Sequence, residues 1–290
     1  MPEGDTIHKL AAALAPRLVG ERILQARLRH ADAEPLIGRR VEAVHAHGKH
    51  LFIALDNGLE LRSHLGMYGS WHRYGRDERW RKPAHQASIV LVTAAEVLVC
   101  FNVRELEWLQ GRSIRQRNFL NRLGPDLLDE CLDLDRVLRR VHEFLDPATP
   151  LCDLLLDQRV AAGIGNAYKS ELIFLARRHP LTPLAMLAEG ELKVVYSQAA
   201  QLLRRNLGGG PRITRWVADG DGRHWVYGRA GEACFVCHDR IQRRLLGRDQ
   251  RSTYWCSRCQ PALARRGQSG AVENQENASA RRSTGVGPER

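Results

Sequence analysis

Four cysteines near the C-terminal end carry the clearest chemical signal in this sequence. Cys234 and Cys237 are separated by two residues, as are Cys256 and Cys259, and 18 residues lie between the two pairs. Two such pairs can place four thiolates tetrahedrally around zinc, and a closed all-cysteine shell is structural rather than catalytic. A pair of redox thiols is the alternative, disfavoured because no thioredoxin-like βαβ pattern surrounds the cysteines. The spacing therefore predicts a zinc ribbon or β-hairpin finger with one structural Zn²⁺.

Basic residues are concentrated in the same segment and dominate the whole chain. Lysine and arginine number 44 against 33 aspartates and glutamates, which gives a formal net charge of +11. A compact surface with that charge attracts polyanions. The arginines in the segment between the cysteine pairs are Arg240, Arg243, Arg244, Arg248 and Arg251. Because guanidinium groups form planar bidentate bonds with phosphate, the predicted finger is a candidate contact with nucleic acid.

An amine at the start of the chain could act as a nucleophile. Removal of Met1 would expose Pro2 as a secondary amine. An N-terminal amine has a pKa near 8, compared with about 10.4 for lysine, so about a tenth of such amines are neutral at pH 7 and able to attack. In most proteins a residue at this position is only the start of the chain, so other residues must support a catalytic interpretation.

Lys49 supplies part of that support. The chain has five lysines against 39 arginines, and Lys49 lies between His47 and His50, where two predicted strands meet. A lysine can donate a proton, whereas an arginine stays protonated in proteins. A solvated turn lysine is the alternative, and we expect His45, His47 and His50 to be hairpin surface rather than metal ligands.

A glycine-containing turn is a candidate phosphate site. In the segment from Gly163 to Asn166 a short turn leads into a predicted helix. The unpaired N–H groups at a helix start can bind phosphate, and Asn166 can cap the helix or hydrogen-bond the phosphate itself. A plain turn with a helix cap is the alternative, but the helices on both sides and the basic finger downstream favour a turn that binds a nucleic-acid backbone.

The N-terminal elements that must position these residues are a helix and a series of strands. Asp5 is the predicted cap of the helix, whose apolar stripe runs from Ile7 to Leu18 and which Pro16 should kink or end. Asn57-Gly58 predicts a hairpin with a type I′ turn, because both residues accept positive φ angles. The runs that we interpret as strands are 41–44, 51–55, 59–65, 88–93 and 97–103. A helix with five or more strands favours a β-sandwich.

From Gly124 onward the hydrophobic period becomes helical, with helices expected near 134–141, 151–158, 167–177 and 189–207. The fold class is therefore expected to be α+β and multidomain. We expect a β-sandwich domain at 1–123, a helical domain at 124–210, a linker and finger at 211–265, and a tail at 266–290. The tail is polar and has almost nothing to bury, which predicts disorder.

Composition also bears on location. The other cysteines, Cys100, Cys131 and Cys152, lie in apolar runs and are expected to be small buried hydrophobes in a reducing compartment. The sequence has no run of 18 apolar residues and no basic-then-apolar start. We therefore expect no membrane partner and a cytoplasmic location, associated with the nucleoid in a bacterium.

Several motifs, taken in order, resemble those of one enzyme family. The matching segments are residues 1–5, the Gly48-Lys49 turn, 63–69, 123–126, 155–158, 163–166 and 251–260. Together they resemble the formamidopyrimidine-DNA glycosylase and endonuclease VIII family of base-excision repair, over residues 2 to about 261. The resemblance implies a bifunctional DNA glycosylase and abasic-site lyase with an N-terminal β-sandwich, a helix-two-turn-helix domain and a zinc finger. A monomer that binds damaged double-stranded DNA in the cleft between these parts is expected, and single-stranded DNA stays open as a substrate.

The resemblance also implies catalytic roles. Pro2 would attack C1′ of the damaged nucleotide and form a Schiff base, with Glu3 as the acid that protonates the opened sugar. Lys49 would donate a proton during β-elimination. Arg251, at the position of the finger arginine, would contact phosphate and assist δ-elimination.

Four residues match positions at which the family contacts DNA. Asn166 matches a phosphate-binding asparagine, and Arg122 matches the arginine before Gly-Pro-Asp that binds DNA in endonuclease VIII. Met67 lies where the family inserts an apolar wedge into the space left by the flipped base. Arg104 is placed to reach the orphaned base, although residues 102–107 depart from the Asp-Pro-Arg-Arg-Phe-Gly of formamidopyrimidine glycosylases.

The same resemblance predicts a preference for oxidised pyrimidines over 8-oxoguanine. Residues 2–5 match the start of endonuclease VIII members, and 213–229 is shorter than the region that closes over 8-oxoguanine in purine-type members. Residues 65–67 are more similar to the purine-type wedge, so an oxidised-purine glycosylase is the alternative. A zinc-containing DNA-binding protein without catalysis is less favoured, because the proline, glutamate and lysine are all present.

Overall fold

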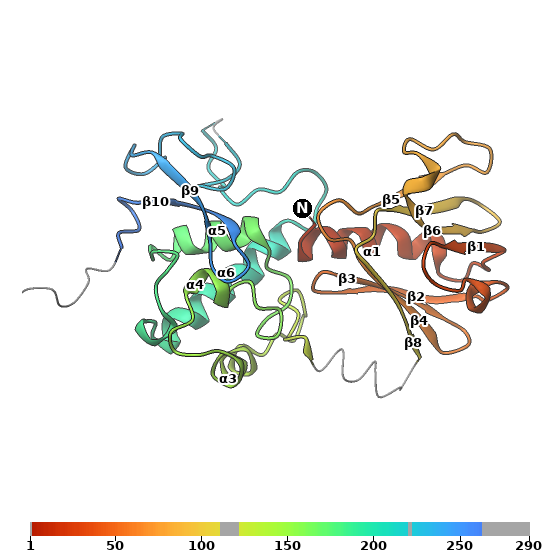
Figure 1. Ribbon diagram of the computed structural model, residues 1–290, viewed down its shortest axis with the longest axis horizontal. Helices are drawn as coiled ribbons and strands as arrows, with labels where there is room; N and C mark the ends of the chain where they lie inside the picture. Colours follow the sequence, from red (N-terminus) through yellow and green to blue (C-terminus); the bar gives the residue numbers. More distant parts are fainter. Residues whose placement is uncertain (1, 111–121, 220–221, 263–290) are drawn as a thin grey trace, which may run out of the picture.

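The computed structural model describes residues 2–110, 122–219 and 222–262. Figure 1 shows a β-rich half and a helical half side by side, with the N-terminus between them. The tail that was expected to be disordered lies outside the described residues. Within the described ranges, none of the helices is both long and apolar enough to cross a lipid bilayer.

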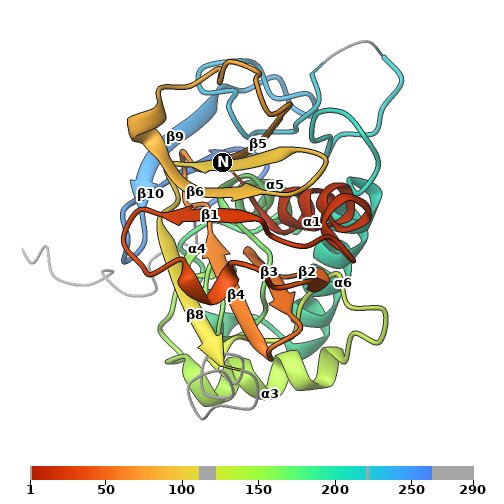
Figure 2. The same ribbon diagram turned by 90° about the vertical axis from the view of Figure 1, so that its right-hand side faces the viewer.

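The β-rich half is a sandwich of two four-stranded antiparallel sheets, which Figure 2 shows one above the other. The first sheet has the order β1 (Gln25–Leu28), β6 (Ala87–Val92), β7 (Val97–Phe101) and β5 (Ser70–Tyr74). The second has the order β2 (Val41–His47), β3 (His50–Leu55), β4 (Leu59–His64) and β8 (Glu105–Gln110). Two short 3₁₀ helices, η1 (Glu34–Leu36) and η2 (Ala84–Gln86), lie in the connections.

Helix α1 (Gly4–Leu18) packs its predicted apolar stripe into the core between the two sheets. Its N-cap is Glu3, so the expected cap at Asp5 is wrong, and Asp5 lies buried in the first turn. Pro16 lies inside the helix and does not end it at once. Because Pro16 is so close to the C-terminal end, its missing N–H removes one hydrogen bond, and Val19 N still donates to Ala15 O at 2.9 Å.

The predicted apolar runs are all strands, but no apolar run predicted β1, β5 and β8. Each of these three lies at the edge of its sheet and has a single hydrogen-bonded neighbour. An edge strand carries polar residues and lacks a continuous apolar run, which is why the pattern misses it. The hairpin at Asn57 and Gly58 is confirmed, but its type I′ turn is wrong: Gly58 has a φ of 77°, and Asn57 does not have a positive φ.

The helical half has its own core, to which four α-helices of the described residues contribute. These are α3 (Leu134–Phe144), α4 (Leu151–Leu154), α5 (Asn166–Leu175) and α6 (Glu189–Arg205), with the 3₁₀ helix η3 (Leu184–Met186) between the last two. Helix α4 is shorter than the predicted 151–158. The chain turns after it, and Gln158 holds this turn by donating from Nε2 to the carbonyls of Leu156 and Ile164 at 2.8 and 3.0 Å.

The cysteine-rich segment folds as an antiparallel hairpin, β9 (Ile241–Leu246) and β10 (Arg251–Cys256), packed against α5. This confirms the predicted hairpin. Among the other cysteines Cys100 and Cys152 are buried as expected, whereas Cys131 is exposed. Cys131 lies in the polar turn before α3 rather than in an element with a buried face, so its apolar neighbours do not cover it.

Backbone contacts join the two halves around the N-terminus. Gly4 N donates to Gly163 O at 2.9 Å. The carboxylate of Asp126, buried in the helical half, accepts from Gly48 N at 2.7 Å and lies 2.8 Å from His8 Nε2. The helical half thus holds both the start of α1 and the turn that carries Lys49.

Candidate active site

A pocket of about 280 Å³ lies where the two halves and the hairpin meet. It contains six of the residues predicted from the sequence, each from a separate segment of the chain. Its lining residues are Pro2, Lys49, His64, Gly66, Met67, Arg104, Leu156, Gln158, Asn166, Asp249 and Arg251. A larger hollow of about 500 Å³ shares Arg104 with it but is lined by none of the other predicted site residues.

Glu3 follows the pocket residue Pro2 in the chain and is fully buried. Its carboxylate accepts hydrogen bonds from Gly165 N at 2.7 Å, Ala167 N at 2.9 Å and Tyr168 N at 3.4 Å. Glu3 therefore satisfies the free N–H groups at the start of α5 and complements the positive end of that helix. Because Glu3 takes the N–H groups of Gly165, Ala167 and Tyr168, a phosphate at this turn would have to bind through other groups, such as the Asn166 side chain.

The guanidinium of Arg212, whose side chain is 15% exposed, balances the charge of Glu3. Arg212 Nη1 lies 3.4 Å from Glu3 Oε1, and Arg212 Nη2 donates to Asp5 Oδ1 at 2.7 Å. The same guanidinium stacks on the ring of Tyr168, 4.8 Å from its centroid. Sequence reasoning missed Arg212, and no local pattern could have found it, since its carboxylate partners are more than 200 positions away.

Lys49 reaches the pocket from the turn between β2 and β3. Gly48 has a φ of 56°, and a Cβ there would lie 2.6 Å from Ala162 Cβ, so only glycine fits this turn against the helical half. Burial lowers the pKa of Lys49 to about 8, with Arg251 and Arg212 acting in the same direction and Glu3 opposing them. The side chain at the pocket wall is therefore an ammonium at neutral pH that can give up its proton far more readily than an exposed lysine.

Asn166 and Arg251 come to the pocket from the other side. Asn166 is the first residue of α5 and Gly165 is the N-cap, so Asn166 does not cap the helix. Arg251 is the first residue of β10, and both side chains line the pocket. Both side chains are therefore in a position to bind an anion at the pocket.

Met67 and Arg104 stand on two loops at the rim of the sandwich. The Met67 residue is 53% exposed, and the Arg104 side chain is 61% exposed. The loops touch, because a Cβ on Gly66 would lie 2.8 Å from Arg104 Cβ. Arg122 is different: it is exposed, does not line the pocket, and its carbonyl accepts from Arg140 Nη2 at 3.3 Å.

His64 is a pocket residue that the sequence analysis did not single out. Burial lowers its pKa to about 4 against the opposing effect of Glu105, so the ring is neutral at pH 7. Beside it, His50 is buried and its Nδ1 accepts from Arg62 Nη1 at 3.0 Å, which corrects the expectation of an exposed His50. Both histidines belong to one row across the sheet, because the strand register pairs His47 with His50, His50 with His64 and His64 with Glu105. Aligning the predicted strands by their turns could have found this row.

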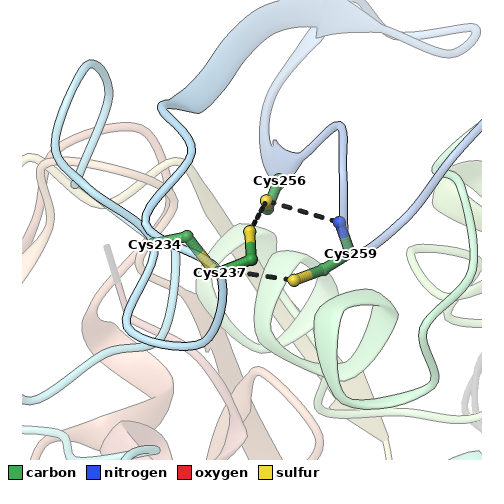
Figure 3. Close-up of side chains that lie close together, drawn as sticks. All are labelled: Cys234, Cys237, Cys256 and Cys259. Atoms are coloured by element: carbon green, nitrogen blue, oxygen red, sulfur yellow. Dashed lines mark hydrogen bonds between the residues drawn. The ribbon is translucent and has the colours of Figure 1, made fainter.

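The four predicted cysteines converge at the base of the hairpin, as Figure 3 shows. All four sulfur atoms lie within 4.8 Å of one another. The Sγ atoms of Cys234 and Cys259 are 3.8 Å apart, and those of Cys237 and Cys256 are 3.3 Å apart. A tetrahedron with metal–sulfur bonds of about 2.3 Å has edges of about 3.8 Å, so this donor set fits one zinc ion with no open position.

Two family models match the chain over the parts just described. The formamidopyrimidine-DNA glycosylase N-terminal domain matches residues 1–109, and the H2TH domain of the same glycosylase matches residues 123–216. The chain belongs to the formamidopyrimidine-DNA glycosylase and endonuclease VIII family of DNA glycosylases and abasic-site lyases.

Relatives named endonuclease 8 are among the most similar members of this family. A probable endonuclease 8 2 of Streptomyces coelicolor is 37% identical over 92% of this chain and 96% of the relative. A DNA-(apurinic or apyrimidinic site) lyase Nei2 of Mycolicibacterium smegmatis is 37% identical over 90% of this chain and 100% of the relative. These names place the chain on the endonuclease VIII side of the family.

Solved structures of the family share the fold. The crystal structure of the Thermus thermophilus enzyme MutM (Fpg) has a TM-score of 0.74 and 30% identity, covering 91% of this chain and 100% of that one. A Lactococcus lactis formamidopyrimidine-DNA glycosylase, bound to DNA that contains an abasic site, has a TM-score of 0.75 and 21% identity. It covers 90% of this chain and 100% of its own. The predicted sandwich, helix-two-turn-helix domain and cysteine hairpin are therefore confirmed as the fold of this family.

Proposed function

We propose that the protein removes oxidised bases from DNA through an N-terminal proline and then nicks the strand at the abasic site. The observation that carries this proposal is the pocket that brings Pro2 together with Lys49, Asn166 and Arg251. A nucleophilic amine, a proton donor and two anion-binding side chains are the groups that this reaction requires.

The proposed chemistry uses these groups in turn. The neutral amine of Pro2 attacks C1′ of the nucleotide, the bond to the damaged base breaks, and ring opening leaves an iminium between Pro2 and the sugar. Loss of a C2′ proton then expels the 3′-phosphate in β-elimination. Lys49 takes the role of proton donor to the departing phosphate oxygen. Arg251 contacts phosphate and assists the second elimination, which expels the 5′-phosphate.

Glu3 takes the role of the acid for the opened sugar in this proposal. Its carboxylate lies next to Pro2 in the chain and accepts three backbone N–H groups of the helical half. These bonds fix the residue that follows the nucleophile, so Glu3 also holds Pro2 in place at the pocket. The helix start of α5 thereby orients the amine toward the sugar.

DNA is proposed to run across the pocket and the hairpin. Asn166 and Arg251 contact the backbone at the damaged nucleotide, Met67 fills the space left by the flipped base, and Arg104 reaches the base opposite. Arg122 lies outside the pocket, and we assign it a backbone contact farther along the duplex. We also propose that the four cysteines bind one structural Zn²⁺, which holds the hairpin in shape.

Oxidised pyrimidines such as thymine glycol are the proposed substrates. Relatives named endonuclease 8 support this choice, and the short segment 213–229 offers few contacts to enclose a bicyclic base. Discrimination by such contacts is worth roughly 10- to 200-fold. Residues 65–67 favour the alternative, an oxidised-purine glycosylase. Single-turnover excision from matched duplexes decides between them: faster release of 8-oxoguanine than of thymine glycol would contradict the pyrimidine assignment.

Borohydride trapping on abasic-site DNA tests the proposed nucleophile. The wild-type protein should form a covalent complex, and a variant with extra residues retained before Pro2 should not, because its proline nitrogen is an amide. A Pro2→Gly variant is not informative, since glycine also leaves an N-terminal amine. Trapping of the extended variant at the wild-type rate would rule out Pro2, and absence of trapping by the wild type would favour a non-catalytic DNA-binding protein.

A further inference from the structure

One buried cation of the helical half has no part in the chemistry proposed above. Lys169 lies in the first turn of α5, three residues after Asn166, and its side chain is fully buried. Burying an ammonium is costly unless each proton has an acceptor. Lys169 Nζ donates to Asn166 Oδ1 at 3.0 Å, to Thr253 Oγ1 at 2.9 Å and to the carbonyl of Ser252 at 3.1 Å. All three protons are therefore used.

The contact with Asn166 fixes which way its amide faces. A lysine ammonium has only donors, so the atom of the Asn166 amide that faces it must be the oxygen. The amide nitrogen, with its two donors, is then left for the pocket that Asn166 lines. Without Lys169 the amide could rotate by half a turn and present its oxygen to an anion, which would repel it.

The other two contacts reach the strand that carries Arg251. Ser252 and Thr253 follow Arg251 in β10, and Lys169 is bonded to both. One side chain thus connects two elements whose side chains line the pocket, the start of α5 and the start of β10. Burial lowers the pKa of Lys169 to about 8, so it is still mainly protonated at pH 7.

We propose that Lys169 is a positioning residue for DNA binding: it orients the Asn166 amide so that its N–H donors face a DNA phosphate. The proposal rests on the proposed function, because it assigns the anion in the pocket to DNA. Lys169 acts through Asn166 and does not itself touch the phosphate.

A double-mutant cycle on Lys169 and Asn166 tests this, with affinity for a duplex that contains a reduced, uncleavable abasic-site analogue as the measurement. Lys169→Met should raise Kd about tenfold in the wild-type background, the effect of one misdirected hydrogen bond to a charged group. In the Asn166→Ala background it should raise Kd less than about twofold, because the amide that it orients is gone. Equal effects in both backgrounds would overturn the proposal.

The salt dependence of Kd separates positioning from direct contact. A cation that binds phosphate contributes about 0.9 to the slope of log affinity against log salt. Lys169→Met should leave the slope unchanged, and a loss of about 0.9 would show that Lys169 binds phosphate itself. Nicking at saturating DNA should stay within about twofold of wild type, so that the effect appears in KM rather than in kcat.

Lys193→Met is the matched control, since Lys193 is exposed on α6 and paired with Asp135 at 2.7 Å. It should bind DNA as the wild type does. Melting temperature and zinc content are measured for every variant, and Lys169→Gln, which retains an amide donor, replaces Lys169→Met in the cycle if the latter does not fold. Failure of the proposed function would abolish trapping by the wild type, whereas failure of this inference leaves wild-type trapping intact.

Discussion

Two lysines on the two halves of the molecule have the same lowered pKa and different surroundings. Burial lowers the pKa of both Lys49 and Lys169 to about 8. Lys49 lies at the tip of a hairpin and lines the pocket. Lys169 lies inside a helix and uses its three protons on fixed acceptors. The comparison shows that a lowered pKa does not identify a proton donor; access to the reacting atoms does.

The two lysines have different surroundings because they lie on different kinds of element. A β-turn at the junction of two domains presents its side chain to the space between them. A helix that packs against a second element encloses its side chains, and an enclosed cation is stable only with hydrogen-bond acceptors around it. In the proposed mechanism the sandwich side of the pocket supplies the nucleophile and the proton donor, and the helix and hairpin side supplies the phosphate contacts.

The largest effect on activity is expected from replacing Lys49. Lys49→Met should reduce the nicking rate on preformed abasic-site DNA about 10³-fold, the typical contribution of a general acid or base. DNA affinity should change less than about threefold. Lys82→Met, a lysine of the sandwich bonded to Ser70 Oγ at 2.8 Å, is the control. Nicking within twofold of wild type in the Lys49 variant would remove it from the mechanism.

Loss of the cysteine cluster should affect the helix and hairpin side of the pocket, and its effect should appear in DNA affinity. A variant with serine at Cys256 and Cys259 should contain no zinc by elemental analysis, and its hairpin should unfold, since structural zinc supplies on the order of 10 kcal/mol to such units. Kd for duplex DNA should rise about 10²-fold, because Arg251 and the other hairpin arginines lose their positions. Unchanged affinity in zinc-free protein would show that the hairpin does not hold DNA.

The pH dependence of nicking should separate the two lysines directly. A proton donor must be protonated, and with the pKa of Lys49 lowered from 10.5 to about 8 the rate should fall about tenfold per pH unit above that value. Below pH 8 the rate should also fall, since an N-terminal amine becomes protonated there. The descending limb should persist in Lys169→Met and vanish from the residual activity of Lys49→Met; the reverse pattern would exchange their roles.

The smallest effect is expected from removing the C-terminal segment, which belongs to neither side of the pocket. Truncation after Arg266 removes three arginines and three glutamates, so the net charge of the removed segment is zero. DNA affinity should change less than about twofold over a range of salt concentrations. A tenfold loss would show that this segment takes part in binding.

Most of the fold was accessible from local patterns. Apolar runs identified the inner strands, and the 3.6-residue period identified the helices, because burial imposes these periods on any element with a covered face. The edge strands β1, β5 and β8 and the early end of α4 were not accessible. Each of these is fixed by a neighbour in space rather than by a period in the chain.

The sequence by itself determined the cysteine spacing, the basic charge, the lysine that follows Gly48 and the candidate amine at Pro2, since each is a property of residue type and short separation. Only the tertiary structure decided that Glu3 occupies the start of α5, that Arg212 balances it and that Lys169 orients Asn166. It also decided that Arg122 lies outside the pocket. The pairings made by Glu3 and Arg212 join charged groups far apart in the chain, and such a group selects its partner by distance in space, which no local pattern records.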